Sequence, residues 1–459
     1  MTSASSSERA PWLARLLGWI ASVFFHIERR GGRMPAGPVL VAANHPNSLL
    51  DPLVVFRTAG RATRPLAKAP LFDQVFVGFM LRALGGLPVY RRQDDAAQMH
   101  RNDETFQRAI DALRAGAAVQ IFPEGITHSE PGLAPLRTGA ARIALCAEQE
   151  SGWQLGLHIV PVGLTYRHKT RFRGRALASV GEPIVVAEWR EAHARNAQEA
   201  VRALTDAIAE RLRAVTLDLT QSEDEALVET AERIWSREKG LTGWRERESL
   251  SQRLPRLQAF ARGLAWLRMN DPARHETLAH DVRRYSEWLH RLGVQEGDVP
   301  PRYGAWGVLR YSLREGLILA IGLPLALVGA LLWAPVWFAP RITLARLRPA
   351  YEAISSYKLV TGFFAAPLLW TFVVAAAGWF LGWMAAVGAA ATVPLLGLCA
   401  LLWSERYVRV KDDADLFLRV LRRPALAAEL EARRGALVRA FDELADTVQR
   451  ESTPDYSPT

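Results

Sequence analysis

The residues with the clearest potential for chemistry lie in the stretch VLVAANHPNSLLDPLVV, residues 39–55. An apolar run ends at Asn44, and both His45 and Asp51 follow within the next seven positions. A histidine beside a carboxylate can act as a general base, because the carboxylate fixes the imidazole tautomer and stabilises the protonated ring. The alternative is structural. Asp51 followed by Pro52 also has the pattern of a helix N-cap, and His45 would then be an ordinary turn residue.

The spacing between His45 and Asp51 decides whether the two side chains can meet. Five residues lie between them. On a continuous helix with 3.6 residues per turn, the two side chains would therefore be about 120° apart. They can pair only if a turn absorbs the additional residue, and Pro46 and Asn47 favour such a turn. Without that turn, Asp51 is only a cap and His45 lacks its carboxylate partner.

Two further polar clusters follow along the chain. Gly85 precedes Arg91 and Arg92 in the run GGLPVYRR, and Glu124 and Gly125 close the run FPEG. A base, a pair of guanidinium groups and a glycine-containing turn suit a substrate that carries a hydroxyl and a phosphate. The sequence has no G-x-S-x-G nucleophile elbow, no Walker loop and no dinucleotide-binding glycine pattern after the first predicted strand. These absences argue against a serine hydrolase with a nucleophile elbow, a P-loop nucleotide hydrolase and a dinucleotide-dependent enzyme.

The elements that must position these residues follow an α/β pattern from Gly37 to about Val215. Short apolar runs alternate with helical periodicity, which predicts a mixed or parallel sheet with flanking helices. Ligands of such sheets bind beyond the carboxyl ends of the strands, and His45 and the FPEG turn both follow a strand-like run. The predicted strands are PVLVAAN, AAVQIFPEG, HIVPVGLTY and ALASVGEPIVV, and the predicted helices are residues 74–84, 102–115, 135–148 and 190–214.

Four sequence blocks, taken in order, resemble the glycerolipid acyltransferases, the family of glycerol-3-phosphate and lysophosphatidate acyltransferases. The blocks are NHPNSLLDP, GGLPVYRR, FPEGITHSEPGLAPLRTGAARIAL and IVPVGLTY, and the resemblance covers roughly residues 20 to 215. The third block has Ile126, Thr127 and His128 where many members have Thr-Arg-Ser. It is therefore similar to the fungal glycerol-3-phosphate and dihydroxyacetone-phosphate branch. The chain departs from the family in having five residues, not four, between His45 and Asp51.

The resemblance implies transfer of a fatty acyl group from a thioester to a glycerol hydroxyl, with His45 as the base and Asp51 as its orienting carboxylate. It implies that Arg91 binds the acceptor's phosphate and that Pro161 and Val162 shape the acyl pocket. The co-substrate would be acyl-CoA or acyl carrier protein, with no further cofactor. The predicted substrate-binding residues are Lys68, Gly85, Arg91, Arg92, Glu124 and Gly125.

The third block favours glycerol-3-phosphate or dihydroxyacetone phosphate as the acceptor in phospholipid synthesis. An alternative is a 1-acylglycerol-3-phosphate acyltransferase that makes phosphatidic acid, because both acceptors present a phosphate. A further alternative is a non-catalytic lipid-binding membrane protein with the same fold. Cys146 and Cys399 and the ten histidines show no metal-ligand spacing, so we expect neither a metal site nor a disulfide framework.

Two uncharged stretches have the length of membrane segments. One has 25 residues between Glu315 and Arg341, and the other has 46 residues between Lys358 and Glu405. The longer stretch would measure about 69 Å as a helix, which allows two passes with a turn near residues 382–388. The net charge of +10 then suits anionic lipid headgroups, and no signature of a nucleic-acid-binding module is present.

Basic residues flank both stretches on every side, which places all the flanks in the cytoplasm by the positive-inside rule. That arrangement is possible only if the first stretch does not cross. Pro324 and Pro335 would let it form a re-entrant hairpin, and the alternative is a kinked single span. We expect an integral membrane protein, in the inner (cytoplasmic) membrane if the source is bacterial, whose catalytic domain faces the cytoplasm.

The N-terminal run PWLARLLGWIASVFFHIERR is interpreted as an amphipathic helix in the membrane interface, with a core-packing helix as the alternative. The predicted organisation of the chain follows from these observations. It comprises an interfacial helix at 1–35, an acyltransferase catalytic domain at 36–215, a helical connector at 216–305, a membrane region at 306–405 (316–340 re-entrant or a single span, 359–404 a two-pass hairpin) and a charged cytoplasmic tail at 406–459.

Overall fold

The structure is a computed structural model that describes residues 11–90, 102–219, 223–241, 249–291, 305–421 and 424–452. Contacts divide the chain into two compact units. The first unit comprises Met1–Glu225, Ser249–Ala261 and Ala350–Ser356, and the second comprises Ala226–Glu248, Arg262–Pro349 and Tyr357–Thr459. The predicted domain boundaries stay predictions.

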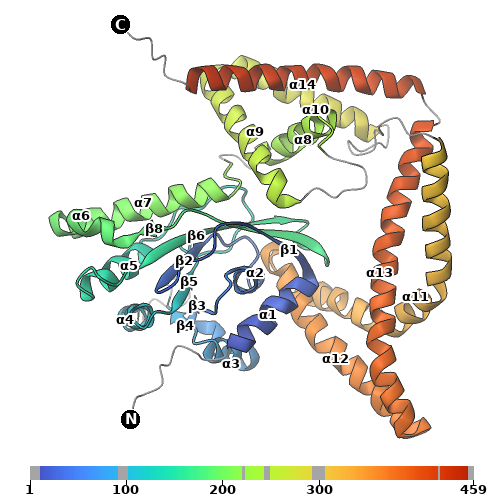
Figure 1. Cartoon of the computed structure of the whole chain (residues 1–459), viewed down its shortest axis with the longest axis horizontal. Helices are drawn as coiled ribbons and strands as arrows, with labels where there is room; N and C mark the ends of the chain where they lie inside the picture. The colour runs from blue at the N-terminus through green and yellow to red at the C-terminus, as the bar shows by residue number, and fades with distance from the viewer. Residues whose placement is uncertain are drawn as a thin grey trace. The chain divides into compact units, whose positions relative to one another are not determined.

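A mixed sheet with flanking helices forms the first unit, which confirms the predicted α/β class (Figure 1). Among the described residues the sheet has eight strands in the order β1-β7-β6-β2-β5-β3-β4, with β8 paired to β6. The four predicted strand regions are confirmed, and β1, β3 and β4 are additional. The bounds are β1 Phe25–Gly31, β2 Val39–Ala43, β3 Thr63–Lys68, β4 Leu87–Val89, β5 Ala118–Ile121, β6 His158–Arg167, β7 Gly174–Val180 and β8 Ile184–Val185.

The centre of the sheet determines where the polar turns meet. Strands β2 and β5 are buried at every position, as expected for continuous apolar runs inside a parallel sheet. Strand β2 pairs in parallel with β5 and β6, and β5 pairs in parallel with β3. Their carboxyl ends therefore lie side by side at one end of the strands, the carboxyl-terminal edge of the sheet. The chain continues from this edge into His45 and the FPEG turn.

The helices of the first unit agree with the periodicity of the sequence. The predicted helix at 190–214 is interrupted at Asn196, whose extended backbone ends one helix and whose side chain accepts hydrogen bonds from the amides of Gln198 and Glu199 at the start of the next. The helices are α1 Pro11–Phe24, α2 Leu50–Thr58, α3 Val75–Ala83, α4 Asn102–Arg114, α5 Gly139–Glu150, α6 Arg190–Arg195 and α7 Ala197–Val215.

The amino-terminal segment differs from the predicted helix at 1–35. The described helix α1 ends at Phe24, and the next seven residues form the edge strand β1, parallel to β7. The charged end of β1 resembled a helix flank in the sequence, although Phe25 is fully buried in the core. One face of α1 is buried against the fold, while Trp12, Leu16 and Trp19 are exposed. A position in the membrane interface stays a prediction.

The second unit is helical. Three helical stretches are long and apolar enough to cross a membrane, namely Leu309–Leu347, Tyr351–Leu381 and Trp383–Lys411. The helices that form this unit or continue into it are α8 Glu223–Glu238, α9 Leu250–Asn270, α10 Pro272–Arg291, α11 Ala305–Leu347, α12 Ile354–Leu381, α13 Trp383–Leu421 and α14 Pro424–Ser452.

Residues 316–340 lie within the single helix α11, so they do not fold as two short helices. Figure 1 shows that α11 bends in its carboxyl-terminal part, which contains Pro335 and Pro340. It packs antiparallel to α13. The indole of Trp403 donates to the Leu319 carbonyl and that of Trp333 donates to the Val393 carbonyl, both at 2.9 Å.

Helices α12 and α13 form the helical pair that was predicted for 359–404. They are joined at Gly382, whose φ of +87° explains the glycine at this turn. The number of times that the chain crosses a bilayer stays a prediction.

Candidate active site

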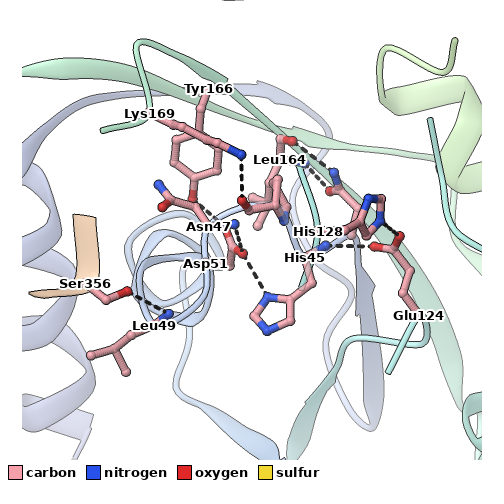
Figure 2. Close-up of polar contacts among 12 residues, drawn as sticks. His45, Asn47, Leu49, Asp51, Glu124, His128, Leu164, Tyr166, Lys169 and Ser356 are labelled. Carbon is pink, nitrogen blue, oxygen red and sulfur yellow. Dashed lines mark hydrogen bonds and ion pairs between the residues drawn. The ribbon is translucent and has the colours of Figure 1, made fainter. Parts of the chain in front are cut away.

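The imidazole of His45 and the carboxylate of Asp51 meet at the carboxyl end of β2 (Figure 2). His45 Nδ1 lies 2.8 Å from Asp51 Oδ2. The side chain of Asp51 is completely buried, whereas that of His45 is 20% exposed. An ionised carboxylate can only accept hydrogen bonds, so Nδ1 carries the proton and Nε2 presents its lone pair. This is the tautomer that a general base requires.

The turn between the two residues absorbs the additional position. Helix α2 begins only at Leu50, and the amide of Asp51 donates to the Ser48 carbonyl at 3.3 Å. Ser48 adopts a left-handed conformation with φ of 47°, which is uncommon for a residue other than glycine. The carboxylate of Asp51 accepts from the Asn47 amide at 2.7 Å, upstream of the helix. Asp51 is therefore a partner of the turn and of His45, and it does not cap α2.

Tyr166 provides a further donor to Asp51. Its hydroxyl donates to Asp51 Oδ1 at 2.7 Å, so both carboxylate oxygens are engaged. Burial, followed by the negative charge of Asp51, raises the pKa of Tyr166 well above its usual 10.0. The phenol therefore stays protonated and keeps donating. Tyr166 was not predicted as a site residue, although it ends the fourth block and lies near the carboxyl end of β6, which is parallel to β2.

Glu124 holds the backbone of the turn from β2 to α2, residues 45–49, which we call the catalytic turn because it begins at the candidate base. Its Oε1 accepts the His45 amide at 2.8 Å, and its Oε2 accepts the Ala134 amide at 2.9 Å. Oε2 also contacts Nε2 of His128, four residues further along the chain. Glu124 is buried, and these partners compensate for the loss of water. Its structural part is thus to join the turn after β5 to the turn after β2.

Two more contacts fix His45. The neighbouring Asn44 exchanges hydrogen bonds with the backbone of Leu164 on β6, at 3.1 Å and 2.6 Å. The His45 ring stacks on Phe122, with 4.1 Å between ring centroids and an interplanar angle of 17°. The imidazole is therefore held through its backbone, its ring face and its Nδ1 atom. This arrangement leaves Nε2 as the atom that can react.

Some of the predicted binding residues lie at the carboxyl ends of the strands and one lies at the amino ends. Lys68 ends β3 and is exposed at the edge where His45 lies. Gly125, with φ of +72°, closes the turn after β5 by donating to the Phe122 carbonyl at 3.1 Å. Gly85, by contrast, precedes β4 and so lies at the amino ends of the strands. Its φ of +68° explains the glycine as a requirement of the turn from α3 to β4.

Arg91 and Arg92 lie outside the described residues, which end at Tyr90 and resume at Asn102. Their role in phosphate binding stays a prediction. The described residues contain no group of three or more His, Cys, Asp or Glu side chains that could hold a metal ion.

Lys169 is a second residue that sequence analysis did not identify. Its ammonium donates to the Pro46 carbonyl at 3.2 Å and to the Ser129 hydroxyl at 2.7 Å. Burial lowers the pKa of Lys169, although nearby carboxylates oppose this effect. It follows β6 by two residues and so reaches the catalytic turn from the neighbouring strand. No motif in the sequence indicated this contact.

Comparison with known proteins identifies relatives of this chain. The acyltransferase family matches residues 26–165, which contain His45, Asp51 and Glu124. An uncharacterised acyltransferase of Schizosaccharomyces pombe is 25% identical, and the alignment covers 96% of this chain and 82% of that protein.

Two further relatives match smaller parts. Glycerol-3-phosphate O-acyltransferase 1 of Saccharomyces cerevisiae is 27% identical over 58% of this chain and 36% of its own length. A chloroplastic 1-acyl-sn-glycerol-3-phosphate acyltransferase of Brassica napus is 26% identical over 28% of this chain and 33% of its own length. The chain thus spans only about a third of each of these two proteins. The resemblance predicted from the four sequence blocks is confirmed: the chain carries a domain of the acyltransferase family, and its relatives include fungal glycerol-3-phosphate O-acyltransferases.

Proposed function

We propose that this protein is a membrane-bound O-acyltransferase that moves a fatty acyl group from a thioester to a hydroxyl of glycerol-3-phosphate or dihydroxyacetone phosphate. The observation that carries the proposal is the His45–Asp51 pair at 2.8 Å inside the domain that matches the acyltransferase family. The yeast relatives named as glycerol-3-phosphate O-acyltransferases support the choice of acceptor. The membrane-length helices fit an enzyme whose product is a lipid.

The geometry supports direct transfer without a covalent intermediate on the protein. His45 Nε2 takes the proton from the acceptor hydroxyl as its oxygen attacks the thioester carbonyl carbon. The C–S bond then breaks, and the imidazolium returns the proton to the departing thiolate. Asp51 keeps the proton on Nδ1 and stabilises the positive charge that forms on the ring. The donor is acyl-CoA or acyl carrier protein, and the reaction requires no other cofactor.

The acceptor's phosphate needs cationic partners at the same sheet edge. Lys68 ends β3 there, and Arg91 and Arg92 follow β4, which is parallel to β3. Guanidinium groups bind phosphate through two hydrogen bonds at once, which favours Arg91 as the main ligand. We keep Glu124 and Gly125 as residues that position the acceptor. Pro161 and Val162 are buried in β6, and we keep them as the residues that shape the acyl pocket.

We place the protein in a membrane, in the cytoplasmic membrane if the source is bacterial, with the catalytic unit on the cytoplasmic side. Basic residues surround both apolar stretches, and this distribution supports that orientation. Thioester donors and glycerol-3-phosphate are water-soluble and would reach the site from that side.

A second acceptor, 1-acylglycerol-3-phosphate, is kept because of the plant relative. The two are separated by measuring thiol release from acyl-CoA and from acyl carrier protein with each acceptor in turn, using detergent-purified wild-type protein. We expect turnover with glycerol-3-phosphate. Turnover with 1-acylglycerol-3-phosphate alone would move the protein to phosphatidic acid synthesis. If folded protein turns over none of the acceptors, the proposal is wrong and a lipid-binding role replaces it.

A further inference from the structure

The segment that joins α11 to α12 is part of the first unit. Residues Ala350–Ser356 comprise a short 3-10 turn, Tyr351–Ala353, and the beginning of α12. Ser355 is completely buried and Ser356 is only 7% exposed, although both begin an apolar helix. Buried hydroxyls need partners, and here the partners belong to the active site.

Ser356 contacts the catalytic turn directly. Its hydroxyl accepts the backbone amide of Leu49 at 3.2 Å (Figure 2). Leu49 is the N-cap residue of α2, a position where backbone amides lack partners inside the helix. Ser356 therefore supplies a partner for the turn that connects His45 to Asp51.

Lys169 links the same segment to the other side of the turn. The ammonium donates to the Pro46 carbonyl and to the Ser129 hydroxyl. That hydroxyl in turn donates to the carboxylate of Glu352. The ammonium also lies 4.8 Å from the ring centroid of Tyr351, within cation–π range.

A third contact closes the arrangement, because the hydroxyl of Ser355 donates to the backbone carbonyl of Lys169 itself. The segment thus contacts both the side chain and the backbone of Lys169. The two ends of the catalytic turn, Pro46 and Leu49, are held by groups that meet on one short stretch of chain.

We propose that residues 350–356, together with Lys169, form a clamp that holds the catalytic turn in its working geometry, with Lys169, Glu352 and Ser356 as positioning residues. Ser48, inside the turn, is in a left-handed conformation that costs free energy for a non-glycine residue, so the turn needs external support. The kinetic part of this inference rests on the proposed acyltransferase function.

The test uses Ser356→Ala and Lys169→Met in the full-length protein. Small misplacements of a catalytic group cost turnover more than binding, so we expect kcat to fall about tenfold or more while KM for both substrates stays within about twofold. Ser356→Thr retains the hydroxyl and should restore kcat. The milder Glu352→Gln should lower kcat less, and it replaces the other variants if they fail to fold.

Two matched controls remove similar groups elsewhere. Thr371→Val removes a hydroxyl that donates to the Pro367 carbonyl within α12, and Lys239→Met removes an ammonium that pairs with Asp442 at 2.9 Å. Neither should change kcat. Unchanged kcat in folded Ser356→Ala and Lys169→Met would overturn the clamp. A large rise in KM for Lys169→Met with kcat unchanged would also overturn it, because Lys169 would then bind substrate.

Hydrogen exchange provides a readout that does not depend on activity. We expect faster exchange of the amides in residues 45–51 in Ser356→Ala and Lys169→Met than in the controls. If the wild type lacks acyltransferase activity but this exchange increases, the proposed function fails and the clamp stands. If exchange is unchanged, the clamp is wrong whatever the activity.

Discussion

Asp51 determines whether His45 can work as a base. Its carboxylate accepts from the His45 ring, the Asn47 amide and the Tyr166 hydroxyl, at 2.8, 2.7 and 2.7 Å. With both oxygens engaged and the residue buried, the carboxylate has one orientation. The imidazole is consequently held with its proton on Nδ1.

Asp51→Asn tests this role at the level of one atom. The amide can donate to Nδ1 and so favours the wrong tautomer, and we expect kcat to fall by about 10³–10⁴ with KM little changed. The control is Asp111→Asn on the exposed face of α4. The role of Asp51 is tested by steady-state kinetics on both variants, and thermal unfolding checks that both are folded. Near-normal kcat in Asp51→Asn would reduce this residue to a structural part of the turn.

Tyr166→Phe has a pH-dependent effect. Because the folded-state pKa of Tyr166 is raised above 10.0, its contribution to stability is fully present below that pH and is lost as the pH rises through the raised value. At neutral pH we expect the variant to lose about 1.5–3 kcal/mol, as for a hydrogen bond to a charged group. Thermal unfolding of both proteins should show the difference shrinking above pH 10. A constant difference would mean that the phenol does not titrate with this partner.

At the scale of the element, the turn between β2 and α2 shows best which features the sequence predicts and which it does not. The alternation of strands and helices, and the joining of His45 and FPEG at one edge, could be predicted because period and strand direction are local signals. The closure of a five-residue spacing could not, since it depends on the φ of Ser48 and on contacts from Tyr166, Lys169 and Ser356.

The edge strand β1 was missed for a related reason. Its residues after Ile27 are largely charged, so its pairing with β7 is visible only in the assembled sheet. Gly85 illustrates a different limit: the φ of +68° in its turn accounts for the glycine, while its predicted part in substrate binding stays a prediction.

Substitutions at Ser48 test the strained turn. Glycine adopts the left-handed conformation readily, so Ser48→Gly should retain activity and stability. Valine should destabilise the protein by about 1–2 kcal/mol, because a β-branched side chain is disfavoured there. The measurement is thermal unfolding combined with kcat for the two variants. If valine is tolerated as well as glycine, the left-handed conformation is not required for the His45–Asp51 contact.

At the scale of the whole molecule, the first unit constrains how the chain can cross a membrane. Both Ser249–Ala261 and Ala350–Ser356 belong to it, so both lie on the same side as the catalytic residues. Among the described residues between them, only α11 is long and apolar enough to cross. The chain must leave and return on one side, so we expect α11 to be a bent re-entrant helix and α12 and α13 to form the two full crossings.

Cysteine labelling tests this topology after Cys146 and Cys399 have been replaced. Arg346→Cys after the bend of α11 and Arg439→Cys on α14 should react from the same side as Arg108→Cys on the catalytic unit. Leu381→Cys, beside the turn from α12 to α13, should react from the opposite side. If Arg346→Cys reacts only from the side opposite to Arg108→Cys, α11 is a full span and the re-entrant arrangement is wrong.

The central claim is that His45 Nε2 is the base of an acyl transfer. It is tested most directly by measuring thiol release from an acyl thioester with glycerol-3-phosphate, comparing wild type, His45→Ala and the control His158→Ala. His158 begins β6 at the opposite edge of the sheet, where its Nδ1 lies 3.0 Å from the Gly156 carbonyl. We expect turnover in wild type and His158→Ala and its loss in His45→Ala. Turnover in folded His45→Ala at the wild-type rate would contradict the account.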